Sequence, residues 1–454
     1  MNTLKLMMMI MAVMLSLTWA PISFAAVSTE EAAKLGTTLT GVGAEKAGNK
    51  DGTIPSYTGG LTKPPANYVP GSGLRPDPFA GEKPLFSISA QNMAQYADKL
   101  NEGTKALMKK FSTFRIDVYK THRSVAYPDF VIRNTVANAV KTKTANGGLS
   151  FVGAHGGYPF PIPKDGYEVM WNHLTTFKGR ANESKMSTYI VDRGGRVIPT
   201  AKMTLWEEYP YYDDDRTRSD SSLYYKLRSS FQGPARKAGE SFLILDPTNM
   251  YEKGRTAYQY LPGQRRVKLA PEIGFDTPDT STGGITIYDE TFMFNGSMDR
   301  YIFKLVGKKE MYIPYNCYKT SFGIKGEELC GPKHLNPNIV RWELHRVWVV
   351  EATLRPGKRH IYSKRYYYLD EDSWAISAAE SYDSKGYLNK VNFSFQIPLY
   401  DVPAPFASFL ASYNMISDNY SLYNWVGDDG YVRPGNPRPE RAWTPESLAS
   451  GVVR

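Results

Sequence analysis

The sequence predicts an α+β fold built on a large, curved antiparallel sheet, and three observations carry this prediction. Residues 341–382 alternate polar and apolar side chains over three segments separated by turns, which is the pattern of an antiparallel meander. The chain contains 32 tyrosines among 454 residues, and tyrosine is enriched in sheets. Helical patterns occur early and strand patterns mostly late, and this segregation is typical of α+β proteins.

The meander begins with Trp342–Leu354, which has apolar residues at most even positions and polar residues at most odd positions. A period of two predicts a strand with one buried and one solvated face. The following residues, Arg355–Lys358, contain the Pro-Gly pair of a type II turn. Further strands are predicted over 359–369 and 374–382.

The first 25 residues have the composition of a secretory signal peptide. Lys5 precedes an apolar run from Leu6 to Leu17, and small residues stand at Ser23 and Ala25. The run is shorter than the roughly 20 residues that span a bilayer, which favours a cleaved export signal over a membrane anchor. We therefore predict a signal peptide over residues 1–25 and a soluble, exported protein.

Residues 26–86 are rich in glycine and proline and lack hydrophobic periodicity. We predict an extended arm here, followed by a single domain over residues 87–454 that carries helical insertions. Three helices are predicted within the first part of this domain, each with a residue that favours a helix start and with apolar positions at helical spacing. They cover 89–111, 128–146 and 165–178.

Strands follow the helices. A Gly194-Gly195 pair between two apolar segments predicts a hairpin. Residues 222–231 are predicted to form a helix, and the residues from Pro398 onward an extended, proline-rich tail. Additional strands are predicted at 242–245, 256–261, 265–269, 298–314 and 390–396.

The net charge of +10 arises from basic residues that are dispersed through the strands. Such dispersal gives no block of the kind that binds nucleic acid, and it favours weak contact with anionic surfaces or head groups. The two cysteines, Cys317 and Cys330, are predicted to form a disulfide, because an exported protein meets an oxidising compartment. Two buried free thiols are the alternative.

Motifs for catalysis are missing from the sequence: it contains no His-Glu-x-x-His, no Gly-x-Ser-x-Gly and no phosphate-binding loop. The histidines, including His345 and His360, are scattered and are interpreted as structural. The acidic run Asp213–Asp215 is compatible with a calcium site, but it is more typical of a solvated turn. We predict neither an enzyme, nor a metal site, nor a cofactor.

Aromatic residues on the predicted strands are the remaining candidates for a function. They either fill a packed core or line a cavity for an apolar ligand, and both interpretations stay open. The predicted wall consists of Trp206, Phe292, Phe294, Phe303, Trp342, Trp348 and Trp374. Basic residues near the turns are predicted to form a rim that meets anionic head groups, with a solubilising surface as the alternative. They are Arg265, Arg266, Lys268, Lys308, Lys309, Lys358 and Arg359.

Several segments resemble a family of exported Gram-negative proteins described as outer-membrane lipoprotein-sorting-like. The resemblance extends over nearly the whole mature chain and is carried by Leu39–Gly60, Pro159–Lys164, Met170–Leu174, Tyr260–Val267, Gly296–Asn316 and Trp342–Trp374. It implies the fold of the periplasmic lipoprotein and lipid carriers, an unclosed antiparallel half-barrel whose concave face is partly covered by helices.

The resemblance also implies a function. A periplasmic carrier of this kind binds a lipid, another lipophilic molecule or lipoprotein acyl chains and transfers it between the inner and outer membranes. Its implied partners are an inner-membrane exporter of the resistance-nodulation-division type and an outer-membrane protein, with transient membrane contact. The alternative hypothesis is a periplasmic adaptor of the exporter that carries nothing and has a filled core.

Overall fold

The computed structural model of this chain describes residues 27–213 and 222–450. The predicted signal peptide lies outside the described residues, as do Asp214 and Asp215 of the acidic run. Within the described part, none of the helices has the length and apolar character that crossing a bilayer requires.

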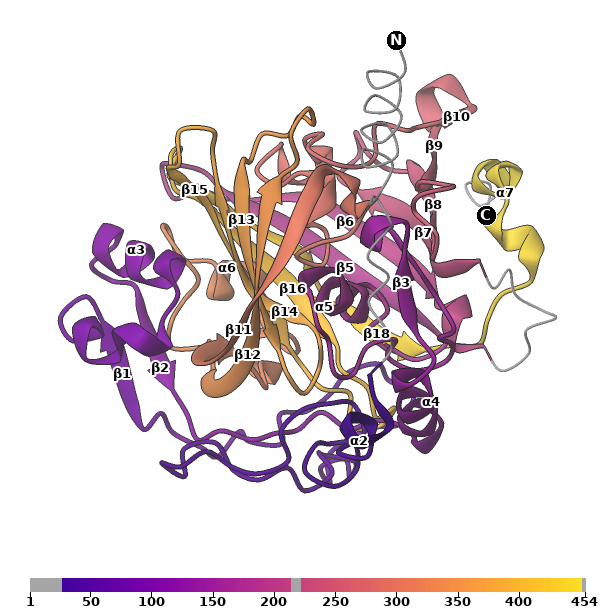
Figure 1. The fold of residues 1–454 in the computed structure, drawn as a ribbon. Helices are drawn as coiled ribbons and strands as arrows, with labels where there is room; N and C mark the ends of the chain where they lie inside the picture. The colour runs from indigo at the N-terminus through magenta and orange to yellow at the C-terminus, as the bar shows by residue number, and fades with distance from the viewer. Residues whose placement is uncertain (1–26, 214–221, 451–454) are drawn as a thin grey trace, which may run out of the picture.

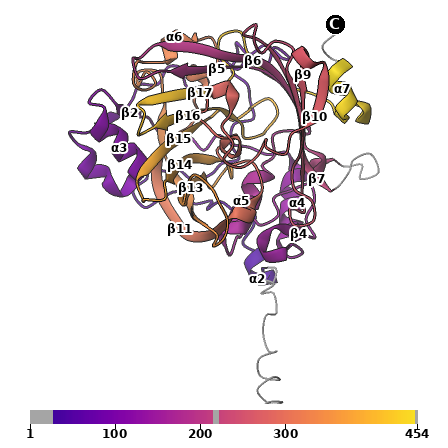
Figure 2. The same ribbon diagram turned by 90° about the horizontal axis from the view of Figure 1, so that it is seen from above.

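One sheet of 16 strands dominates the fold and is strongly curved (Figures 1 and 2). Its two edges do not pair with each other, so the predicted unclosed half-barrel is confirmed. From one edge to the other the main strands are β11 (Tyr301–Pro314), β12 (Trp342–Leu354), β13 (Lys364–Asp370), β14 (Ile376–Tyr382), β15 (Leu388–Gln396), β16 (Ala407–Asn414), β17 (Asn419–Trp425), β5 (Ala181–Val191), β6 (Val197–Glu208), β7 (Leu223–Gly233), β8 (Ser241–Pro247), β9 (Thr256–Leu261) and β10 (Arg266–Leu269).

Neighbouring main strands are antiparallel throughout. The short strands β1 (Phe86–Ser89) and β2 (Arg115–Val118) form a hairpin that touches β12 through one parallel bridge. At the centre of the sheet β18 (Tyr431–Pro434) also pairs with β5, while β3 (Lys143–Ala145) and β4 (Ser150–Val152) make a separate two-stranded sheet.

Helix α5 (Gly166–Leu174) lies inside the curve of the sheet (Figure 2). Asp165 caps it as predicted, because its side chain accepts a hydrogen bond from the backbone N–H of Glu168. Together with the loop over residues 270–300, α5 fills the concave side, and its Val169, Met170 and Trp171 are fully buried.

Two other helices, α3 (Glu102–Lys110) and α7 (Pro445–Ser450), lie outside the sheet. The predicted helix over 89–111 is divided into η1 (Met93–Lys99) and α3, because Asn101 starts a new helix by capping Thr104. α3 packs against β14 and β15 from outside, and α7 covers β8, β9 and β10 (Figure 2). α4 (Asp129–Ala139) begins directly after Pro128, as predicted.

Two sequence predictions about elements are wrong. Residues 222–231, predicted as a helix, belong to strand β7, whose two faces are both covered. The segment after Pro398, predicted as an extended tail, contains β16 and β17, which join the two halves of the sheet. The odd positions of β12 were expected to be solvated, but Glu343 and His345 are buried there at 0% and 1% exposure.

The arm over residues 27–85 contains only one short helix, α2 (Thr29–Ala32), and runs along one end of the half-barrel (Figure 1). It is nevertheless firmly packed. The carbonyl oxygen of Val42 accepts a hydrogen bond of 2.9 Å from the indole of Trp374, and the backbone of Gly43 leaves no room for a Cβ beside Pro161. The arm therefore closes this end of the concave interior.

Candidate ligand site in the half-barrel

Most of the predicted aromatic wall is packed core rather than an open surface. Trp348 and Trp374 stack with their ring centroids 5.8 Å apart, and Phe294 and Phe303 meet edge to face at 5.7 Å. Trp342 contacts the ring of Phe393 on β15 at 5.1 Å. Between β11 and β15 the half-barrel is therefore filled by its own side chains.

Trp206 does not join this group. Neighbouring residues of a strand point to opposite faces, and Leu205 belongs to the main core, so Trp206 faces the convex side. There it packs against a small cluster that includes Trp443 and Leu448, below the guanidinium of Arg438. The prediction that Trp206 shares a wall with the other aromatic residues is wrong.

The basic residues do not form one rim either. Lys308 pairs with Glu371 at 2.8 Å and lies over the ring of Trp348. Lys309 is the next residue of β11, and its ammonium lies 3.4 Å from the carbonyl oxygen of Leu100. The remaining basic residues are exposed or half-buried and lie in two other turns of the chain. Arg265, Arg266 and Lys268 lie around the β9–β10 hairpin, and Lys358 and Arg359 lie between β12 and β13.

A cavity of about 60 Å³ lies against the concave face of β6, β7 and β8. The alternation of the strands places apolar residues of all three on this face, and the 270–300 loop covers them. The apolar part of its lining is Met203, Leu205, Leu227, Phe231, Phe242, Ile244 and Ile273.

Two further cavities share lining residues with this one. Arg255 and Ile273 also line a wider cavity of about 420 Å³, which reaches the surface between Tyr251 and Lys358. Asn295 also lines a cavity of about 20 Å³ between α5 and β7. We call these three cavities together the interior channel.

Arg255 lies at the junction of the two larger cavities. Its Nε and Nη2 bind the carboxylate of Asp246 at 2.8 and 2.7 Å, and Nη2 also donates to the side-chain oxygen of Asn295 at 2.7 Å. Burial disfavours its charge, but Asp246 keeps the pKa of Arg255 above its usual value. The ion pair places two opposite charges, fixed by their mutual hydrogen bonds, in the wall of the channel.

The inner end of the channel contains further titratable groups. Lys178, just after α5, lies with its ammonium 4.2 Å from the ring centroid of Phe292. Burial lowers its pKa, and Glu207 on β6 acts in the opposite direction. His173 stays neutral, because burial and the charge of Lys178 lower its pKa to about 4.

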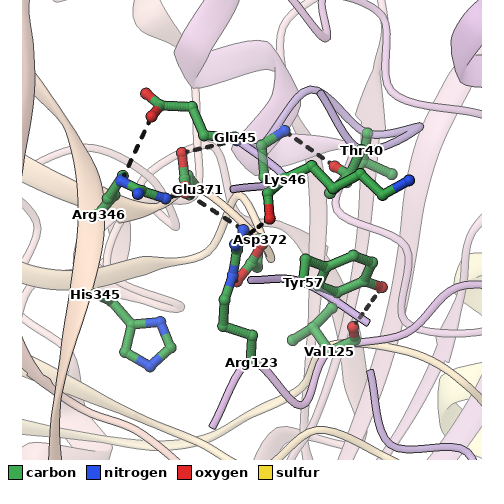
Figure 3. Close-up of polar contacts among 12 residues, drawn as sticks. Thr40, Glu45, Lys46, Tyr57, Arg123, Val125, His345, Arg346, Glu371 and Asp372 are labelled. Atoms are coloured by element: carbon green, nitrogen blue, oxygen red, sulfur yellow. Dashed lines mark hydrogen bonds and ion pairs between the residues drawn. The ribbon is translucent and has the colours of Figure 1, made fainter. Parts of the chain in front are cut away.

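A separate cluster of buried charges holds the arm (Figure 3). Both oxygens of Asp372 accept hydrogen bonds from Arg123, at 2.7 and 2.8 Å, and Arg346 bridges Glu371 and Glu45 of the arm. These contacts tie three distant parts of the chain together.

The geometry of this cluster resembles a metal site, because ligand atoms of His345, Asp370 and Asp372 lie within 4.8 Å of one another. The residues do not fit a metal, however. Arg123 occupies both oxygens of Asp372, and His345 lies between Asp370 at 3.2 Å and Glu343 at 3.4 Å. Protein cations thus balance these carboxylates, and we assign the cluster to anchoring the arm.

The predicted disulfide is wrong, because Cys317 and Cys330 are both buried free thiols. The sulfur of Cys317 lies 3.4 Å from the carbonyl oxygen of Arg341, whereas Cys330 interacts with the hydroxyl of Tyr420. The spacing in sequence sets only an upper limit on the distance between the two sulfur atoms and does not bring them together.

The channel residues Lys178, Arg255 and Asn295 were not predicted. Each stands next to a glycine or in a short polar segment that is typical of a solvated turn. The only signal in the sequence is the apolar alternation of the neighbouring strands, which shows that a face is buried but not that a cavity remains on it.

Comparison with known proteins gives one close relative and a family. An uncharacterised protein of Pseudomonas aeruginosa is 39% identical over 433 residues, which is 95% of each chain. Among solved structures, an outer membrane lipoprotein-sorting protein domain from Vibrio parahaemolyticus is 17% identical, with a TM-score of 0.43, and covers 62% of this chain and 97% of its own. A LolA superfamily protein from Nitrosomonas europaea is 10% identical, with a TM-score of 0.37, and covers 62% and 98%.

The family model described as "Protein of unknown function (DUF1329)" matches residues 87–449. This match covers nearly all of the sheet, from β1 to α7. The chain therefore belongs to the DUF1329 family.

Proposed function

We propose that this protein is a periplasmic carrier that binds a hydrophobic molecule on the concave side of its sheet. The interior channel carries the proposal, because its cavities lie next to one another from the buried apolar face of β6, β7 and β8 to the surface. Its outer cavity of about 420 Å³ has the size of a small-molecule site. The role is binding and transfer, with no catalytic step.

The walls supply the affinity. Apolar ligand surface that leaves water contributes about 25 cal/mol per Å², or about 0.8 kcal/mol per buried methylene group, so the affinity rises with the length of apolar chain inside the channel. At the mouth, the exposed Tyr251 lines the cavity, and Lys358 pairs with Asp299 there. Apolar and basic side chains side by side suit transient contact with a membrane surface.

Export and the partners are part of the same proposal. The N-terminal segment would direct the chain to the periplasm, where the carrier would move its ligand between the inner and outer membranes. Delivery from an exporter of the resistance-nodulation-division type to an outer-membrane protein is the route that the sequence resemblance suggests.

A substitution that fills the channel tests the proposal. Ile244→Trp places an indole in the inner cavity, and we expect it to weaken binding of the neutral fluorescent probe N-phenyl-1-naphthylamine by about tenfold or more. Ile416→Trp, at an exposed position outside the channel, is the matched control and should bind like the wild type.

Native mass spectrometry of the protein purified from its own periplasm should also detect a copurifying lipophilic molecule. Ligand-free protein that does not bind the probe would contradict the carrier function. A periplasmic adaptor that carries nothing would then be the better hypothesis, and capture of the exporter would be its test.

A further inference from the structure

Lys178 is an ammonium group placed inside the half-barrel. It follows α5 and lines the innermost cavity of the channel together with Tyr209, Tyr225 and Phe292. Its Nζ lies over the ring of Phe292 at 4.2 Å and 6.0 Å from the ring centroid of Tyr209. An ammonium in such surroundings has lost most of its hydration.

Lys178 has no anion within ion-pair distance among the residues that the structure describes. Glu207 acts on its charge from a longer distance, but one oxygen of Glu207 accepts the hydroxyls of Tyr209 and Tyr225, at 3.1 and 2.7 Å. An ammonium has three donors and no acceptor, so the half-buried Lys178 can bind acceptor oxygens in addition to those of the protein.

The channel offers a route for such acceptors. Asn295 lines both the innermost cavity and the apolar cavity on β6–β8, and Ile273 continues that cavity to the mouth. The cavities beside Lys178 and along Leu227 and Ile244 measure only about 20 and 60 Å³, so a chain molecule with oxygen atoms at one end would reach Lys178 by displacing the side chains between them.

We propose that the ligand is a single-chain amphiphile with an anionic head group, whose oxygens bind the ammonium of Lys178. This inference rests on the proposed carrier function and names the class of its ligand. A carboxylate and a phosphate monoester share the required chemistry, because both offer charged acceptor oxygens at about 2.7–2.9 Å from an ammonium. The apolar chain extends from Lys178 toward the mouth.

The experiment compares three ligands of one chain length: dodecanoate, dodecyl phosphate and dodecanol. Isothermal titration with the mature protein should give tighter binding of at least one anion than of the alcohol. Lys178→Met, which keeps the length of the side chain, should reduce that preference about tenfold and leave dodecanol binding unchanged. Lys178→Arg should retain the preference.

Lys304→Met is the matched control, since Lys304 is exposed on β11 and outside the channel. This variant should prefer the anions over dodecanol as strongly as the wild type does. Equal binding of acid and alcohol by the wild type, or an unchanged preference in Lys178→Met, would overturn the inference but leave the carrier function intact. Failure of all three ligands to bind would instead count against the carrier function itself. If Lys178→Met does not fold, the wild type and Lys178→Arg decide the outcome. The stronger of the two anions identifies the head group.

Discussion

At the scale of single residues, burial decides which polar side chains matter, and the sequence pattern indicates burial only for apolar ones. Glu343 and His345 occupy the polar positions of β12, where alternation predicts contact with water. They are buried because a segment distant in sequence covers them, and the backbone N–H of His122 donates to Glu343 at 2.7 Å. No local pattern indicates such a cover.

His345 provides a prediction about stability and pH. Burial opposes its protonation, but hydrogen bonds to Asp370 and Glu343 raise the pKa of His345 to about 9. Because the folded state favours the protonated imidazole, this group stabilises the fold fully below about pH 6.5. The stabilisation is lost as the pH rises through about 9. The contribution is roughly 3 kcal/mol at low pH.

Urea unfolding at about pH 6 and about pH 10 measures this contribution. We expect the wild type to lose roughly 3 kcal/mol more between the two conditions than His345→Gln, because the variant has no imidazole to titrate. The same pH dependence in both proteins would show that His345 is not the stabilising cation.

At the scale of elements, strongly periodic segments and caps were predicted from sequence, and elements covered on both faces were not. The Gly194-Gly195 turn between β5 and β6 and the start of α5 at Asp165 are where the pattern places them. Strand β7 was missed because its outward residues are also engaged: Lys226 binds Glu440, and Arg228 binds the carbonyl oxygen of Ser447. Its polar residues thus do not mark a solvated face, and the alternation is lost.

The cap of α5 is a testable element, because this helix fills the concave side and its C-terminal end leads to Lys178. Asp165→Ala removes the side-chain acceptor of the Glu168 backbone N–H, which lies 2.9 Å away, and should destabilise the protein by about 1 kcal/mol. Asp165→Asn keeps an acceptor and should change stability little. Denaturant unfolding of the three proteins measures both effects, and equal losses in the two variants would exclude capping as the cause.

At the scale of the whole molecule, the order of strands in the sheet differs from their order in the chain. β17, near the C-terminus, pairs with β5, so Tyr420 lies opposite Val191 and Leu422 opposite Tyr189. The last long strands thus connect a half made of β11–β15 to a half made of β5–β10 (Figure 1). Sequence patterns locate strands but not their distant partners. The pattern therefore predicts a tail after Pro398, where β16 and β17 form the centre of the sheet.

This topology makes the two parts of the C-terminal region unequal. Truncation after Ile397 removes β16 and β17, leaves new unpaired edges on β15 and β5, and exposes the core on both sides. We expect this variant to show no cooperative unfolding transition and to aggregate, because open apolar edges pair with other chains.

Truncation after Gly435 is the matched control, since it leaves every strand in place and removes only the segment that carries Trp443 and Leu448. Loss of these two buried side chains should cost roughly 3 to 6 kcal/mol, while the sheet remains folded. Near-ultraviolet circular dichroism and size-exclusion chromatography distinguish the two variants. A folded, monomeric protein that ends at Ile397 would show that the half-barrel consists of two independent sheets. The channel on β6–β8 would then be stable without the aromatic core between β11 and β15.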